Sequence, residues 1–256
     1  MLGSGCAGFP GAGRPDIVPA VSDSPLVHYT LEAQTAIVQM DDGKANALSH
    51  AMIDQLLEAL ARAEKEASAM ILTGRPDRFC AGFDLKVMMS SPENAKNLLV
   101  RGAELYMRLY GAAVPLVVAC TGHALAGGSL VLLTGDVRVG AQGPFRIGLN
   151  EVQIGLPVPV LAMELARDRL VGSELGRATL QATIYGPAEA AAVGYLDVAV
   201  APEQVLPRAK EEAARLGALA KSAYHATKMR LRGRTIRHVR DTLAEDMATL
   251  LTGDPA

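Results

Sequence analysis

The chain has 256 residues and a mass of 26.8 kDa, which suits one hydrophobic core with a small appendage and excludes a disulfide-stapled miniprotein. Half of the residues are hydrophobic, and 25 lysines and arginines nearly balance 27 aspartates and glutamates, which excludes a disordered composition and a basic field for nucleic acid. Aromatic residues make up only 4% and tryptophan is absent, so we expect a ligand to be held by aliphatic walls and backbone groups.

The three cysteines, Cys6, Cys80 and Cys120, lie far apart and match no metal-ligand or CxxC spacing. This usage is typical of a reducing compartment and argues against structural zinc. We therefore expect a cytoplasmic location and no bound metal.

Residues 1–25 are rich in glycine, proline and alanine and show no hydrophobic periodicity. This composition predicts a disordered tail, and it lacks the charged start and apolar region of a secretion signal. We place an α/β core at 26–200 and a C-terminal helical region at 201–256.

Strands and helices alternate along the predicted core. Two short strands are expected at 26–32 and 35–41, then a helix capped by Ser49, and a strand at 69–74. The pattern continues with a helix over 92–110, a strand at 116–120, a short helix after Gly127, and strands at 136–140 and 196–200. From Val160 onward the remaining segments are mainly helical. This order predicts an α/β layered fold with buried strands.

The stretch from Leu109 to Gly135 carries no formal charge and is long enough to span a bilayer. Pro115 and the pair Gly127 and Gly128 divide it into a β-branched piece and a leucine-rich piece. We therefore interpret it as a buried strand followed by a buried helix, with no membrane span.

Small residues follow two of these apolar strands, at 79–86 (FCAGFDLK) and 122–136 (GHALAGGSLVLLTGD). Glycine and alanine let the backbone approach a ligand and direct its N–H groups toward it, so the two loops are candidates for an oxyanion hole. The second loop also opens a helix, whose N-terminus favours an anion. The alternative is a pair of tight strand-to-helix turns.

Glu151 lies in an apolar segment, 147–156 (IGLNEVQIGL), with no other carboxylate. An apolar wall disfavours the charged form of a carboxylate, which suits a group that accepts and returns a proton near neutral pH. A structural role, as a loop cap or as a partner of Arg146 or of another cation across the fold, is the alternative at this stage.

For the other candidate residues, the sequence indicates structural roles. His123 is expected to be packed and hydrogen-bonded, Cys80 to be a small buried side chain, and Asp136 to bond local backbone N–H groups. The basic cluster within 228–240 suits a solvated helix face. No GxxxxGK[ST] or GxGxxG motif is present, so a nucleotide cofactor has no support.

Four ordered motifs together carry a family resemblance: DGKANAL at 42–48, FCAGFDLK, GHALAGGSLVLLTGDVRVG and IGLNEVQIG. In this order and at these separations they resemble the crotonase (enoyl-CoA hydratase/isomerase) family, from Leu26 to the C-terminal helices. The resemblance implies a crotonase-like spiral of β-β-α units with a C-terminal helical trimerisation region. It also implies an acyl-CoA thioester substrate, no cofactor beyond the coenzyme A of that substrate, and a homotrimer or dimer of trimers.

The resemblance also assigns roles to residues at matching positions. Glu151 becomes the catalytic base, and the N–H groups of Phe83 and Gly127 hold the thioester oxygen. The coenzyme A moiety is bordered by Ala45, Ala81, Asp84 and Leu85, with Lys86 and Lys228 as phosphate contacts.

One departure from the family pattern selects among its activities. Hydratases of this family carry two glutamates, and here the first position is Leu130, so that only Glu151 remains. Adding water needs a water oriented by two carboxylates, whereas shifting a double bond needs one base. The chain is therefore most similar to the 3,2-enoyl-CoA isomerases of fatty-acid oxidation.

Three alternatives stay open: an enoyl-CoA hydratase (a lyase) that activates water in another way, a non-catalytic acyl-CoA binder, and a thioester hydrolase or decarboxylase. Pocket depth, and with it acyl chain length, depends on which of Met88, Met89, Leu98 and the C-terminal helices converge.

Overall fold

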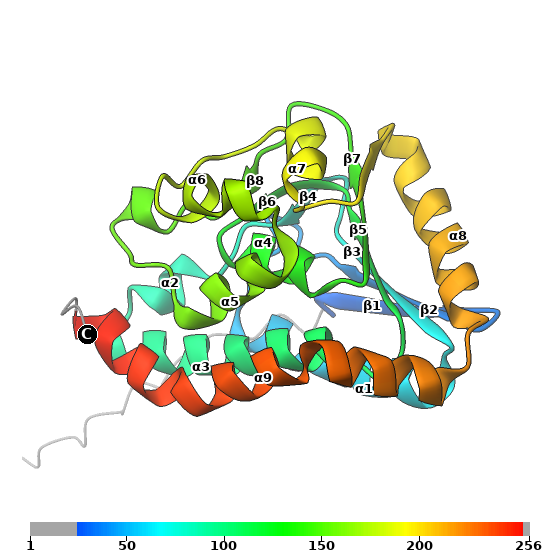
Figure 1. Ribbon diagram of the computed structural model, residues 1–256, viewed down its shortest axis with the longest axis horizontal. Coiled ribbons are helices and arrows are strands. Elements are labelled where there is room, and N and C mark those ends of the chain that lie inside the picture. Colours follow the sequence, from blue (N-terminus) through cyan, green and yellow to red (C-terminus); the bar gives the residue numbers. More distant parts are fainter. Residues whose placement is uncertain (1–24, 253–256) are drawn as a thin grey trace, which may run out of the picture.

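The computed structural model describes residues 25–252, which form one layered α/β unit (Figure 1). The predicted tail over 1–25 lies, apart from Pro25, outside the described residues. The main sheet has six strands in the order β1-β2-β3-β5-β7-β9, and all neighbours pair in parallel except β1 and β2. These strands are β1 (Val27–Glu32), β2 (Thr35–Met40), β3 (Ala69–Thr73), β5 (Leu116–Cys120), β7 (Val137–Ala141) and β9 (Val198–Val200). The strands predicted from hydrophobic runs are confirmed within one or two residues at each end.

A second, three-stranded parallel sheet was not expected from the sequence. It contains β4 (Asp77–Cys80), β6 (Gly122–Leu125) and β8 (Ile147–Gly148). Each of these strands follows a strand of the main sheet, and each is followed in turn by a helix. The β-β-α unit thus recurs along the chain, which confirms the spiral architecture implied by the resemblance.

Helices cover both faces of the main sheet. They are α1 (His50–Glu66), α2 (Leu85–Met88), α3 (Pro92–Tyr110), α4 (Gly127–Thr134), α5 (Val160–Arg169), α6 (Leu175–Thr179), α7 (Pro187–Val193), α8 (Val205–Gly217) and α9 (Lys221–Thr252). The Met52 N–H donates to Ser49 Oγ at 3.2 Å, which confirms the predicted helix cap. The bounds of α3 coincide with those predicted, because Pro92 starts it and Gly111 follows its end.

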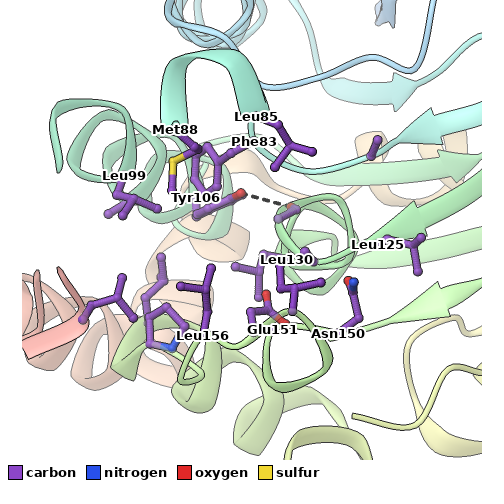
Figure 2. Close-up of a pocket in the computed structure, with 18 of the residues that line it drawn as sticks. Phe83, Leu85, Met88, Leu99, Tyr106, Leu125, Leu130, Asn150, Glu151 and Leu156 are labelled. Carbon is purple, nitrogen blue, oxygen red and sulfur yellow. Dashed lines mark hydrogen bonds between the residues drawn. The ribbon is translucent and has the colours of Figure 1, made fainter. Parts of the chain in front are cut away.

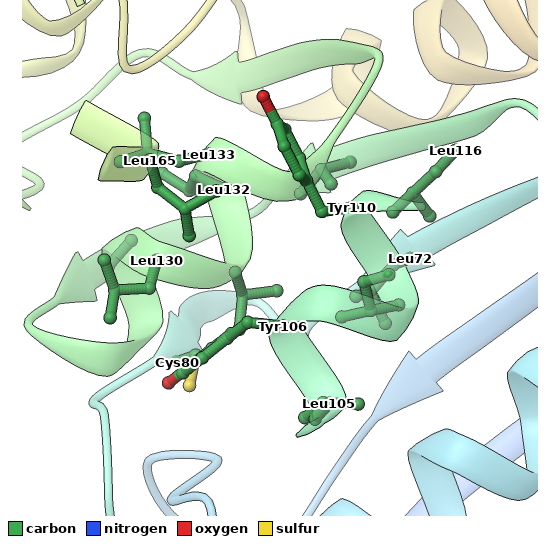
Figure 3. Close-up of a cluster of buried hydrophobic side chains, with 14 of the residues drawn as sticks. Leu72, Cys80, Leu105, Tyr106, Tyr110, Leu116, Leu130, Leu132, Leu133 and Leu165 are labelled. Atoms are coloured by element: carbon green, nitrogen blue, oxygen red, sulfur yellow. The ribbon is translucent and has the colours of Figure 1, made fainter. Parts of the chain in front are cut away.

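The core lies between the main sheet and α1, α3 and α4, and most of its side chains are aliphatic, with a few buried aromatic rings such as those of Tyr106 and Tyr110 (Figure 3). On the opposite face of the sheet, α8 packs its apolar side, including Val205 and Ala209, against Ile71 and Val117. The uncharged run found in the sequence forms β5, β6 and α4 inside this core. Across the described residues, no helix is long and apolar enough to cross a membrane.

A buried ion cluster holds the long helix α9 against the rest of the fold. Asp136 accepts from Lys228 Nζ at 2.7 Å and from Arg232 Nη1 at 2.9 Å. Lys228 Nζ also donates to the Ala112 and Val114 carbonyls, each at 3.0 Å. Burial lowers the pKa of the Lys228 ammonium, and the Asp136 carboxylate opposes this shift.

This cluster corrects the predicted role of Lys228. The side chain has no hydrogen left for a coenzyme A phosphate, because its three donors are used within the chain. The expectation of a wholly solvated basic face is also wrong, since Lys228 and Arg232 lie one turn apart on the buried side of α9. Both cations are structural.

Removing the Asp136 carboxylate should leave two buried cations without a counter-charge. We expect Asp136→Ala to lower the free energy of unfolding by about 3 to 5 kcal/mol, the cost of breaking a buried ion pair. Urea unfolding followed by circular dichroism measures the change. Glu211→Ala, which removes an exposed pair with Arg208, is the control and should cost less than about 1 kcal/mol. Equal losses in the two variants would contradict this account of how α9 is held.

Candidate active site

A cavity of about 550 Å³ opens at the ends of β4 and β6, between α2, α3 and the last turns of α9 (Figure 2). Its walls are mainly aliphatic and come from segments far apart in the sequence, including Leu85, Met88, Leu99, Leu156, Met247 and Leu250. The polar side chains among the lining residues are Tyr106, Asn150 and Glu151. An apolar cavity with few polar groups is the usual form of a small-molecule site.

The two loops predicted to carry backbone donors meet at this cavity. Gly82 has φ +93°, and a Cβ placed on it would lie 3.2 Å from the Gly127 nitrogen, so the loops touch through glycine. The Leu48 N–H donates to Gly82 O and the Asp84 N–H donates to Leu48 O, which fixes the peptides on either side of Phe83. The structure therefore brings Phe83 and Gly127 to one wall of the cavity.

Neither of these two amides has an acceptor among the described residues. The Phe83 N–H takes no part in the pairing with Leu48, and Gly127 is the first residue of α4, where an N–H has no acceptor within the helix. Two unpaired N–H groups on adjacent loops suit the binding of one carbonyl or enolate oxygen.

Strained backbone directs Gly127 into this position. Ala126 has φ 46° and ψ −122°, a combination that is sparsely populated for alanine. It is held by its N–H, which donates to Gly148 O at 3.0 Å, and by its carbonyl, which accepts from the Ser129 N–H at 2.8 Å. Gly128 is also required, because a Cβ there would lie 2.0 Å from the Cys80 carbonyl oxygen.

Glu151 lies across the cavity and is 7% exposed. Its Oε2 has no hydrogen-bond partner among the described residues, and the ion pairs found there include none to Arg146. Burial raises the pKa of the carboxyl above its ordinary value of 4.5, against a smaller lowering effect of its own backbone N–H. Neither a side-chain helix cap nor an ion pair of Glu151 is found among the described residues, and a carboxylate whose Oε2 has no partner there lines the cavity.

Leu130 occupies the cavity wall beside Glu151 and is 3% exposed (Figure 2). Glu151 is the one carboxylate among the residues that line the cavity. No cluster of histidine, cysteine, aspartate and glutamate able to hold a metal ion occurs within residues 25–252. The cavity thus offers two amide donors and one base.

The other predicted contacts divide between the cavity and its supports. Ala81 and Leu85 line the cavity, whereas Ala45 lies behind Ala81 and accepts its N–H at 3.1 Å. Asp84 caps α2 by accepting the Lys86 N–H at 2.8 Å. The Lys86 side chain is exposed next to this turn and does not line the cavity.

Of the side chains named as candidates for setting the depth of the cavity, only some line it. Met88 and Met89 line the cavity, but Leu98 is fully buried in the main core and its neighbour Leu99 lines the cavity instead. The reason is the helical rotation between adjacent residues of α3, which places them on different faces. His123, by contrast, is packed as expected: it contacts Phe145 and accepts the Arg146 N–H at 3.1 Å.

Three further residues line the cavity that were not predicted from the sequence. Tyr106 donates its hydroxyl to the Gly127 carbonyl at 3.0 Å, and Asn150 leaves its buried Oδ1 without a partner among the described residues. Met247 closes the cavity from α9, more than 90 residues beyond Glu151. Periodicity indicates that Tyr106 lies on the buried face of α3, but only the fold shows that its hydroxyl reaches the second loop.

Comparison with known proteins places the chain among acyl-CoA enzymes. Residues 30–251 match the enoyl-CoA hydratase/isomerase family. The human protein named enoyl-CoA delta isomerase 1, mitochondrial, is 32% identical over 237 residues, which are 90% of this chain and 78% of that protein.

Solved structures are similar over nearly the same range. A crystal structure of an enoyl-CoA hydratase/isomerase family protein from Pseudomonas syringae has a TM-score of 0.86 at 39% identity, covering 88% of this chain and 98% of that chain. An enoyl-CoA hydratase from Mycobacterium ulcerans has a TM-score of 0.82 at 36% identity, covering 88% of this chain and 97% of that chain. The similar proteins thus carry both isomerase and hydratase names.

The buried Glu151 carboxylate should lower the stability of the fold as it ionises. Because its pKa is raised in the folded state, stability is lost as pH rises from the ordinary value of 4.5 through the folded-state pKa. The Gln side chain in Glu151→Gln cannot ionise. The free energy of unfolding of this variant should therefore increase relative to that of the wild type as the pH rises from 4 to 7. Urea unfolding across this range measures the difference. A difference that does not change with pH would show that the carboxylate is not in a desolvated site.

Proposed function

The chain belongs to the enoyl-CoA hydratase/isomerase family, and we propose that it is an enoyl-CoA isomerase of fatty-acid oxidation that converts a 3-enoyl-CoA into a 2-enoyl-CoA. The observation that carries the proposal is the arrangement of two backbone N–H groups, without acceptors in the described part of the chain, and one buried carboxylate around an apolar cavity. This set supplies what a double-bond shift needs and lacks the second carboxylate of a water-adding site.

Substrate binding follows from the shape and polarity of the cavity. The thioester oxygen accepts hydrogen bonds from the Phe83 and Gly127 amides, and the acyl chain extends along aliphatic side chains toward Met247. The coenzyme A moiety leaves past Ala81 and Leu85, with Lys86 free to meet a phosphate at the exposed edge. The low aromatic content of the chain fits a ligand held by amides and alkyl groups.

The proposed reaction moves one proton between two carbons. The Glu151 carboxylate takes a proton from C2, and the electrons of that C–H bond delocalise over the thioester and the C3–C4 double bond as a dienolate. The two amides stabilise the negative charge on the enolate oxygen. The protonated Glu151 then delivers the proton to C4, which leaves a C2–C3 double bond and restores the carboxylate. A raised pKa suits both halves of this cycle, because the same group must accept and return the proton.

Hydration of a 2-enoyl-CoA is the second candidate, and it is favoured by the hydratase name of the Mycobacterium ulcerans relative. Asn150, whose buried Oδ1 has no partner in the described part of the chain, is a polar side chain that could hold a water beside Glu151. An amide does not take up a proton as a carboxylate does, so Leu130 leaves that water without a second acid or base. Crotonyl-CoA and 3-hexenoyl-CoA, assayed side by side, separate the two activities through formation of a 3-hydroxyacyl-CoA or of a conjugated thioester.

Loss of the base should abolish most of the turnover. We expect Glu151→Gln to lower kcat for 3-hexenoyl-CoA isomerisation by about 10²- to 10⁴-fold, the range for a positioned general base. The Gln side chain keeps the volume of the site, so KM should change much less. Glu164→Gln, which alters a carboxylate on α5 outside the cavity lining, should keep the wild-type rate. Full activity in Glu151→Gln would remove this residue from the mechanism.

The pH dependence of the wild type should report the same group. Only ionised Glu151 accepts the C2 proton, so kcat/KM should rise with pH and level off above an apparent pKa higher than 4.5. Initial rates between pH 4.5 and pH 8 measure this profile. A profile that is flat, or that falls over this range, is incompatible with a buried carboxylate base.

A further inference from the structure

Tyr106 contacts both of the residues that supply the backbone donors. Its hydroxyl donates to the Gly127 carbonyl at 3.0 Å, and its ring meets the Phe83 ring edge-on, with centroids 6.1 Å apart and planes at 74° (Figure 2). The side chain is fully buried. Burial holds the pKa of its hydroxyl well above the ordinary value of 10.0, so the group stays protonated and remains a donor throughout the working pH range.

Helix α3 is also shaped to receive Phe83. A Cβ on Gly102, one helical turn before Tyr106, would lie 2.3 Å from the Phe83 ring, so only glycine leaves room for that ring at its present position. The Phe83 ring is thereby fixed between Gly102 and Tyr106. One helix therefore contacts both loops, although they belong to different β-β-α units.

The hydrogen bond also opposes a specific strain. Ala126 has a backbone conformation that alanine rarely adopts, and this conformation presents the Gly127 N–H at the cavity wall. The Tyr106 bond anchors the carbonyl at the other end of Gly127. The Ala126 carbonyl, in the same peptide as the Gly127 N–H, is held by the Ser129 N–H, and the Tyr106 bond fixes the next peptide as well. Removing the hydroxyl therefore takes away one of the contacts that fix the orientation of Gly127.

We propose that Tyr106 is a positioning residue that holds the Phe83 and Gly127 amides in the arrangement that binds an enolate oxygen. This role rests on the proposed function, since it concerns the same two donors. Tyr106 acts through Gly127 and Phe83, and it exchanges no proton with the substrate.

The test compares two conservative substitutions on the same helix. Tyr106→Phe removes the hydroxyl that reaches Gly127. Tyr110→Phe removes a hydroxyl one turn later, which donates to Asp168 Oδ2 at 2.8 Å and lies away from the cavity. Figure 3 shows the two side chains leaving α3 in different directions. Each variant is assayed for kcat and KM with 3-hexenoyl-CoA and titrated with acetoacetyl-CoA, whose enolate absorbs in the near ultraviolet.

We expect Tyr106→Phe to lower kcat by about 10- to 100-fold, less than the loss of an oxyanion donor itself, while KM stays within about threefold. The enolate band of bound acetoacetyl-CoA should weaken in the same variant. Tyr110→Phe should keep the wild-type kcat and band even where its melting temperature falls. Gly102→Ala, which displaces the Phe83 ring without touching the hydroxyl, should also weaken the band, and it provides a second test should Tyr106→Phe fold poorly.

Wild-type kcat and a full enolate band in Tyr106→Phe would overturn the positioning role and leave the proposed function intact. Equal losses in Tyr106→Phe and Tyr110→Phe would also overturn it, because they would indicate general loosening of α3. If the wild type itself did not convert 3-hexenoyl-CoA, the proposed function would fail, and the positioning role with it.

Discussion

The contact between the loops after β4 and β6 is the constraint on which the site depends. Gly82 and Gly127 approach so closely that a Cβ on either would lie within 3.4 Å of the other residue. Gly128 permits the same close approach to Cys80. These contacts bring together the two loops that carry the Phe83 and Gly127 N–H groups, and both residues line the cavity. Backbone donors on rigid, buried segments need little reorganisation when charge develops on a substrate oxygen.

The three-stranded sheet explains how such distant loops come together. Residues of β4, β6 and β8 belong to successive β-β-α units, and their pairing aligns the ends of the strands. Ser129 connects this arrangement to Glu151: its Oγ accepts the Gly148 N–H at 3.0 Å, and Gly148 lies three residues before the glutamate. The first turn of α4 and the loop that carries Glu151 are thus joined by a buried hydrogen bond. The amide donors and the base are held as one unit.

The main sheet and most helices could be predicted from the sequence because their signals are local. Continuous Val and Leu runs marked β5, Ser49 marked the start of α1, and Pro92 marked the start of α3. The second sheet could not be predicted in this way. Its strands are only two to four residues long, and they contain glycine and charged residues. They form because partners distant in sequence pair with them, and single-segment patterns do not report such pairing.

The site shows the same division between local and long-range information. The three motifs placed Phe83, Gly127 and Glu151, and the fold brings all three to one cavity. Lys228 was misassigned because the resemblance carries a residue over by position and does not reveal which cations of a helix are buried. Its partner Asp136 lies 92 residues away. Tyr106 was missed for a similar reason. A tyrosine on the apolar face of a helix is interpreted as a core residue, and its contact with the loop at Gly127 is seen only in the fold.

The central claim is that one carboxylate moves one proton from C2 to C4 inside an apolar cavity. The most direct measurement is turnover of 3-hexenoyl-CoA deuterated at C2, in ordinary water, with the position of deuterium in the product determined by NMR. The account predicts 2-hexenoyl-CoA that carries part of the C2 label at C4, because Glu151 is shielded from solvent and holds the deuteron between the two steps. Complete loss of the abstracted label to solvent, or accumulation of 3-hydroxyhexanoyl-CoA in place of the conjugated product, would contradict it.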